Sequence, residues 1–163
     1  MNEDLNTRIT LLHRLRDHDD DSSWAEFVEI YTPLRFAYCR KREIKSQEIT
    51  DIAQEVFRSV SLAMGKFQYD PNKGHFRAWL FTVLRNTIVT HFHKANRAPI
   101  TSRETQLINR LESHEQEEAG HWDHDYRLRL LNWAMKKIQP EFSERNWNIF
   151  TETALHENSV DEV

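Results

Sequence analysis

The sequence contains few residues that interrupt helices. Its 163 residues include 3 glycines and 4 prolines, the two residue types that most often end a helix or start a turn. No stretch shows the sustained alternation of β-branched and polar residues that is typical of a half-buried strand. These absences favour helices throughout, so the sequence predicts an all-α fold that is large enough to bury a sizeable core.

Cysteine and long apolar runs are also scarce. Cys39 is the single cysteine, which excludes an intramolecular disulfide and a zinc site built from several cysteines. No apolar run approaches the roughly 20 residues that a membrane-spanning helix needs, and the N-terminus does not resemble a signal peptide. We therefore expect a cytoplasmic protein with no membrane partner.

An overall positive charge is absent as well. The formal net charge is −4, whereas a general DNA-binding domain is usually basic. The charge is unevenly distributed, however, because residues 66–97 contain 6 basic and 1 acidic side chain and so carry a net charge of +5. This pattern predicts a local phosphate-facing patch on a chain whose remaining surface repels DNA.

Within this basic stretch, a loop with aromatic residues precedes a helix. Residues 66–77 contain Asp70, Pro71 and Gly74, which are typical of a turn, with aromatic side chains on both sides of it. From residue 78 to residue 97, apolar residues recur at helical spacing. The opposite stripe of this predicted helix is polar and consists of Thr82, Asn86, Thr90, His93 and Arg97. Such a loop and helix together indicate a surface that binds unpaired nucleic acid.

The helix predicted over residues 48–64 has an outer face that suits protein docking. This face presents carboxylate, amide and guanidinium groups from Asp51, Gln54, Glu55 and Arg58, and it also includes the apolar Leu62, which we expect to be exposed. Asp51 and Glu55 are four residues apart, as two catalytic carboxylates on one helix can be, but no nucleophile accompanies them. We therefore interpret the face as a docking surface and not as an acid–base site.

Three short segments follow one another along the chain, namely Asp51-Ile52-Ala53-Gln54-Glu55-Val56-Phe57, Phe76-Arg77-Ala78-Trp79-Leu80 and Arg85-Asn86. Together, in this order, they resemble bacterial sigma factors of the extracytoplasmic-function group, the small members of the sigma-70 superfamily. The resemblance covers roughly residues 24–97, the domain called region two. It implies a protein that is not an enzyme, uses no cofactor or metal, and directs RNA polymerase to promoters while assisting strand opening.

The resemblance also implies two binding surfaces. The helix over residues 48–64 would dock on the coiled-coil clamp helices of the RNA polymerase β′ subunit, through Asp51, Gln54, Glu55, Phe57 and Arg58. The loop and the next helix would capture a base flipped from the nontemplate strand of the minus-ten promoter element. The predicted DNA-binding residues are Lys66, Phe67, Tyr69, Lys73, Arg77, Thr82, Asn86, Thr90, His93, Lys94 and Arg97. An anti-sigma factor is a further candidate partner.

The sequence predicts three parts along the chain. Residues 1–97 form a region-two-like domain, residues 98–121 an acidic linker in which a helical part is left open, and residues 122–163 the start of a region-four-like domain. Alternatively, the acidic residues of the linker fold back over the basic patch as a mimic of DNA. The family's helix-turn-helix for the minus-thirty-five element would begin about where the chain ends. We therefore expect the last domain to be incomplete, and the sequence leaves open whether the chain is truncated.

Two other functions remain open at this point. A helical DNA-binding regulator would share the domain shape without engaging polymerase, and it would bind duplex DNA by itself. A metal-dependent hydrolase would use the histidines and the helix carboxylates. His91 and His93 are too small a ligand set for a metal site, and the acid-rich residues 17–23 suit helix capping better than metal binding.

Overall fold

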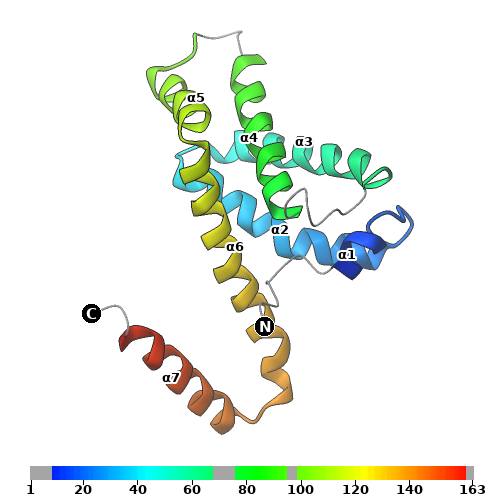
Figure 1. The fold of residues 1–163 in the computed structure, drawn as a ribbon, viewed down its shortest axis with the longest axis vertical. Helices are drawn as coiled ribbons and strands as arrows, with labels where there is room; N and C mark the ends of the chain where they lie inside the picture. Colours follow the sequence, from blue (N-terminus) through cyan, green and yellow to red (C-terminus); the bar gives the residue numbers. More distant parts are fainter. Residues whose placement is uncertain (1–8, 68–75, 95–98, 161–163) are drawn as a thin grey trace. The chain divides into compact units, whose positions relative to one another are not determined.

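The computed structural model describes residues 9–67, 76–94 and 99–160. Over these ranges the chain forms helices and no strand, which confirms the predicted all-α fold (Figure 1). None of the described helices is long and apolar enough to cross a membrane. The elements are α1 (Ile9–Arg14), α2 (Asp21–Lys41), α3 (Ser46–Met64), α4 (Phe76–Lys94), α5 (Ser102–Ser113), α6 (Glu115–Ile138), the short 3-10 helix η2 (Gln139–Glu141) and α7 (Glu144–Val160).

Side-chain caps determine where two of these helices begin. The Asp20 carboxylate accepts a hydrogen bond of 2.9 Å from the Ser23 backbone N–H and caps α2, so the acid-rich residues 17–23 include a helix cap, as predicted. Thr101 and Glu104 cap α5 reciprocally, because each side chain accepts a hydrogen bond from the backbone of the other residue. This pair satisfies two of the backbone N–H groups that a helix start leaves without partners.

The chain divides into two compact units, Met1–Arg127 and Leu128–Val163, and the division falls inside α6. The boundaries expected from the sequence lie elsewhere, after residues 97 and 121. Most of the expected linker is helical, since it contains α5 and the start of α6, and it belongs to the first unit. The assignment of functional domains to these segments stays a prediction.

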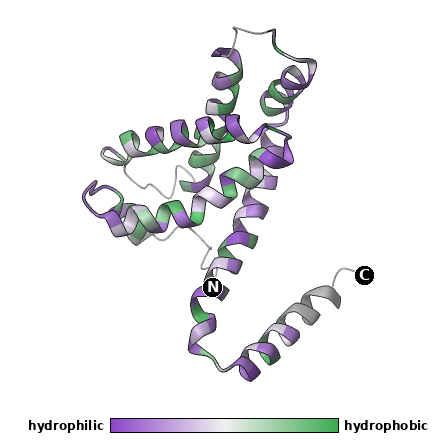
Figure 2. Ribbon diagram, turned by 180° about the vertical axis from the view of Figure 1, so that it is seen from behind, coloured by the Kyte–Doolittle hydropathy of each residue, from purple (hydrophilic) through white to green (hydrophobic). Residues whose placement is uncertain are grey.

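The core of the first unit forms where α1 to α4 bury their apolar faces. Apolar and polar residues alternate along these helices, as Figure 2 shows. In α3 the buried side chains recur every three or four residues, namely Ile49, Ile52, Val56, Val60 and Met64, which is the spacing of a single helix face. Phe27 and Tyr31 of α2 contact the ring of Phe76 at the start of α4, with centroids 6.2 and 5.8 Å apart.

The N-terminal half of α6 completes this core. Trp122 is 1% exposed, contacts the rings of Tyr38 and Phe81, and donates a hydrogen bond of 3.0 Å from its indole N–H to the Arg77 carbonyl. Tyr126 stacks on Tyr31, with centroids 5.8 Å apart. Because these rings are large and fully covered, this half of α6 is an integral part of the first unit.

A buried carboxylate joins three helices beside Trp122. Glu118 of α6 is 0% exposed and accepts hydrogen bonds from the Tyr38 hydroxyl at 2.7 Å and from Arg110 Nε at 2.7 Å. Arg42, which follows α2, donates to the same carboxylate, and its guanidinium lies over the Tyr38 ring. Burial raises the pKa of Tyr38 to about 12, so its hydroxyl stays a donor at neutral pH.

The second unit contains the end of α6, η2 and α7. Pro140 lies in η2, where α6 ends, and Ser143 directly precedes α7, so the helix boundaries predicted from these two residues are confirmed. Phe142, Trp147 and Phe150 form a chain of ring contacts. Several apolar side chains of this unit are nevertheless exposed, among them Leu131, Phe142, Ile149 and Phe150.

Candidate functional site

The outer face of α3 is exposed as the sequence predicts. Asp51, Gln54, Glu55 and Arg58 are all exposed, because the helical period places them opposite the buried face of the helix. Arg58 lies 3.6 Å from Glu55, three residues earlier. This exposed pair contributes little to stability, so both charges remain available to a partner.

Two other side chains modify the predicted docking surface. Phe57 is half-buried and packs edge-on against Trp24 of α2, with ring centroids 5.5 Å apart, so part of its surface is used inside the fold. Leu62, which the sequence also places on this outer face, is 71% exposed. It continues the helical stripe of Asp51, Glu55 and Arg58 at spacings of three and four, a signal that the sequence already contained.

The polar stripe of α4 is also accessible. Asn86, Thr90, His93 and Lys94 are exposed, and Thr82 is half-buried. The Thr82 hydroxyl donates a hydrogen bond of 3.1 Å to the Ala78 carbonyl, which leaves its oxygen able to accept one. The four exposed side chains therefore present amide, hydroxyl, imidazole and ammonium groups along one helix.

Three aromatic rings cluster where the loop meets α4. Phe67 contacts both Phe76 and Trp79, at 5.7 and 5.5 Å between centroids, and Lys66 beside it is exposed. Phe76 is 2% exposed and serves the core, whereas Phe67 and Trp79 are half-buried and keep part of their surface accessible. The predicted DNA-binding residues Tyr69, Lys73 and Arg97 lie outside the described residues.

The structure contradicts a phosphate-binding role for Arg77. Its side chain is turned inward, with the residue 6% exposed, and Arg77 Nε donates to the Asp123 carboxylate of α6. The guanidinium also lies 5.3 Å from the centre of the Tyr126 ring. A phosphate has no access to a cation in this position, so Arg77 acts within the fold. The sequence could not reveal this because Asp123 is 46 residues away along the chain.

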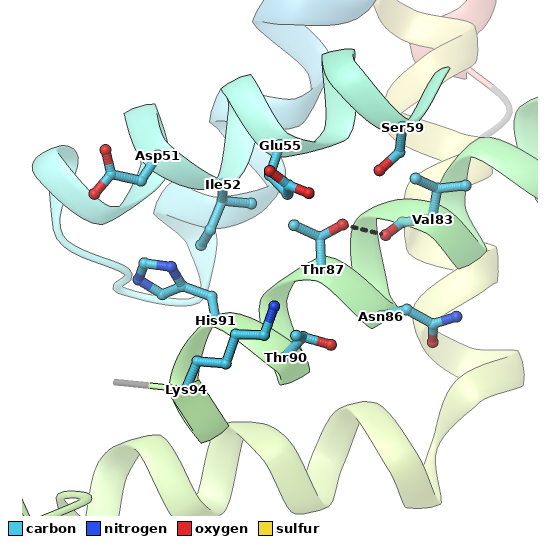
Figure 3. A pocket seen from close by; sticks show the side chains of 10 residues that line it. All are labelled: Asp51, Ile52, Glu55, Ser59, Val83, Asn86, Thr87, Thr90, His91 and Lys94. Atoms are coloured by element: carbon cyan, nitrogen blue, oxygen red, sulfur yellow. Dashed lines mark hydrogen bonds between the residues drawn. The ribbon is translucent and has the colours of Figure 1, made fainter. Parts of the chain in front are cut away.

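A groove of about 670 Å³ lies between α3 and α4. Figure 3 shows the side chains of both helices facing it. Asp51 and Glu55 of the predicted polymerase-binding face line one wall, and Asn86, Thr90 and Lys94 of the predicted DNA-binding face line the other. Ser59, Thr87 and His91 also line the groove, although none of them was predicted to belong to the site.

The wall of the groove formed by α3 is acidic, and the wall formed by α4 carries polar and basic side chains. Asp51 and Glu55 place two carboxylates on the α3 side, while Lys94 and His91 lie on the α4 side. Among the residues that the structure describes, no group of three or more histidine, cysteine, aspartate or glutamate side chains is arranged to hold a metal ion. The groove thus presents carboxylates on its α3 side and hydrogen-bonding and basic groups on its α4 side.

Comparison with known proteins gives two matches. Residues 27–98 match the family model of sigma-70 region 2. The chain is also 26% identical over 86 residues to the ECF RNA polymerase sigma factor RpoE of Cereibacter sphaeroides, a match that covers 53% of this chain and 46% of that protein. The chain thus spans less than half the length of this relative. No solved structure matches the chain. The matched segment contains α3, α4, their groove and most of α2, and over these residues the chain is similar to sigma-70 region 2 and to a sigma factor of the extracytoplasmic-function group.

Proposed function

We propose that this chain is an RNA polymerase sigma factor that binds core polymerase through α3 and the nontemplate strand of the minus-ten element through α4. The observation that carries the proposal is the groove, where the exposed faces of both helices meet within residues 27–98. This role depends on binding energy alone and requires no catalytic residue. It also places the chain in the cytoplasm, where core polymerase works.

The charges of the two walls support this division of roles. Asp51 and Glu55 would repel DNA phosphates, so the α3 stripe suits a protein partner, and Leu62 adds an exposed apolar group at its end. We therefore add Leu62 to the proposed docking surface. Arg77 is removed from the proposed DNA contacts because of its burial.

On the DNA side, α4 provides hydrogen-bonding groups and the aromatic cluster provides stacking surface. Breaking one base-stacking step costs about 1.4 kcal/mol, and stacking a base on an aromatic side chain recovers about 1–3 kcal/mol. Phe67 and Trp79 keep accessible ring surface and are the proposed stacking partners among the described residues. Lys66 and Lys94 would contact phosphates, while Asn86 and Thr90 would contact base edges.

Binding to purified core RNA polymerase tests the proposal. The wild-type chain should bind, and the Asp51→Ala/Gln54→Ala variant should bind at least about tenfold more weakly, because a few residues dominate most interfaces. The matched control is Glu112→Ala/Gln106→Ala, which removes one carboxylate and one amide from exposed positions of α5 and should bind like the wild type. Failure of a folded wild-type chain to bind would overturn the sigma-factor proposal.

The same samples distinguish the main alternative. A helical regulator that does not engage polymerase would bind duplex DNA without polymerase and would ignore the Asp51→Ala/Gln54→Ala change. A sigma factor would instead gain promoter binding when polymerase is present. An anti-sigma partner stays a prediction, since no observation on the described residues points to its docking site.

A further inference from the structure

A second pocket lies on the first unit, formed by the end of α2, by α5 and by α6. It encloses about 270 Å³ and is lined by Lys41, Arg42, Arg110, His121, His124 and Asp125. None of these residues belongs to the α3–α4 groove. The pocket is thus a separate feature, and its lining is dominated by groups that donate hydrogen bonds.

The lining carries more positive than negative charge. Lys41, Arg42 and Arg110 contribute three cations, whereas Asp125 is the single carboxylate among the lining residues. Lys41 Nζ contacts both Asp125 oxygens, at 2.7 and 2.9 Å. Outside the lining, the buried Glu118 pairs with Arg42 and Arg110, and the exposed Glu117 lies 4.0 Å from Arg110. Two imidazole rings, at His121 and His124, add further donors at the exposed side.

One of the cationic groups also has an unused donor. Arg42 donates from Nη1 to the Tyr38 carbonyl and from Nη2 to Glu118. Its Nε is buried and makes no hydrogen bond to any part of the chain that the structure describes. A buried donor without a partner costs about 1–3 kcal/mol.

We propose that this pocket binds a small phosphate-bearing anion, such as inorganic phosphate, pyrophosphate or the terminal phosphates of a free nucleotide. Guanidinium groups suit phosphate oxygens, which accept several charge-assisted hydrogen bonds at once. The volume is below that of pockets for drug-sized ligands, so the pocket suits a small ligand. An anion held here contacts α2, α5 and α6 together and so stabilises the packing of α6.

Calorimetric titration of the full chain with pyrophosphate, at matched ionic strength, tests the site. The wild type should show saturable binding and a raised melting temperature. Arg110→Gln and His121→Glu/His124→Glu should each weaken binding by about tenfold or more, the loss expected for one charge-assisted hydrogen bond. Both histidines are exposed, so the double variant keeps its fold even if Arg110→Gln does not. Arg103→Gln, on the same helix but outside the pocket, should bind like the wild type.

Two results would overturn the proposal. One is the absence of saturable pyrophosphate binding by the wild type. The other is unchanged binding by the double histidine variant. Competition with a single-stranded oligonucleotide identifies the source of the phosphate. If the pocket takes a free anion, pyrophosphate should bind without displacing an oligonucleotide that is bound elsewhere on the chain. If the oligonucleotide binds at this pocket and pyrophosphate does not, the site serves nucleic acid and the free-anion proposal fails. Polymerase is not needed in any arm, so this outcome is independent of the proposed sigma-factor role.

Discussion

At the scale of single residues, Glu118 is the most consequential charge in the first unit. It is fully buried, with the hydroxyl of Tyr38 and the guanidinium groups of Arg42 and Arg110 as its partners. Its replacement by alanine leaves the Arg42 guanidinium buried without its anion, and Arg42 is the less exposed of the two arginines. Breaking a buried ion pair in this way costs about 3–5 kcal/mol.

We therefore expect Glu118→Ala to lower the free energy of unfolding by about 3–5 kcal/mol, measured by urea denaturation. The neighbouring Glu117 is the matched control. Its side chain is 56% exposed and lies 4.0 Å from Arg110, so Glu117→Ala should change stability by less than about 0.5 kcal/mol. Equal effects of the two substitutions would contradict the role assigned to Glu118.

Cys39 is a buried residue whose chemistry follows from its surroundings. Burial raises the pKa of the Cys39 thiol from 9.0 to about 12, and the reactive thiolate is therefore scarce at neutral pH. Alkylation by iodoacetamide at about pH 8 should be very slow in the folded protein and should follow the rate of unfolding when urea is added. Alkylation of the native protein as fast as that of a free thiol would contradict this burial.

The raised pKa of Cys39 also has a consequence for stability. The folded state keeps the proton of this thiol to higher pH than the unfolded state does, so this group stabilises the fold fully below about pH 9 and progressively less as pH rises towards 12. Cys39→Ala removes this contribution. The stability of the variant should therefore fall less steeply than that of the wild type over this pH range, as measured by urea denaturation. An identical pH slope for the two proteins would contradict the shift.

At the scale of elements, α6 decides the extent of the first unit. Its Trp122 is covered by Tyr38 and Phe81 and bonds to the backbone of Arg77. Trp122→Ala should lower the free energy of unfolding by about 3–5 kcal/mol, as is usual for a large buried aromatic residue. It should also increase amide hydrogen exchange more strongly in α5 and α6 than in α3. Trp122→Phe keeps most of the packing and should cost less. Uniform exchange throughout the unit would contradict an effect centred on α6.

The helices were predictable to very different degrees. For α3, the period of apolar residues alone predicted both the buried face and the exposed stripe, because a helix of 3.6 residues per turn places them without reference to the rest of the fold. For α5, the capping pair Thr101 and Glu104 and the apolar positions Ile108 and Leu111 were local signals of a helix. The acidic composition of residues 112–118 nevertheless favoured a linker in which only part of the chain is helical.

At the scale of the whole molecule, electrostatics limit what the chain can do alone. The net charge is −4, and α6 pairs Asp123 with Arg77 and Glu115 with Arg85. Two of the six basic residues in the stretch 66–97 are thus neutralised within the fold. Of these two acidic residues only Glu115 belongs to the expected linker, and a fold-back of that linker over the basic patch stays a prediction. The chain alone should therefore bind promoter DNA weakly.

We expect salt to reveal the phosphate contacts that remain once the chain is assembled with polymerase. The slope of log affinity for promoter DNA against log salt concentration should decrease by about 1 for Lys94→Gln, since each phosphate contact releases about one counterion. Lys45→Gln, an exposed lysine just before α3, should leave the slope unchanged. A slope that does not respond to Lys94→Gln would remove this residue from the proposed interface.

The sequence by itself determined the all-α fold, the helical faces of α3 and α4 and the resemblance to a family, because each depends on residues within a few turns of one another. Only the tertiary structure decided that Arg77 is buried, that Glu118 joins three helices, and that most of the expected linker belongs to the first unit. Asp123 lies 46 residues from Arg77, and Glu118 lies 76 and 80 residues from Arg42 and Tyr38. Apolar periodicity identifies which side of a helix is buried, but it does not identify the helix that covers it.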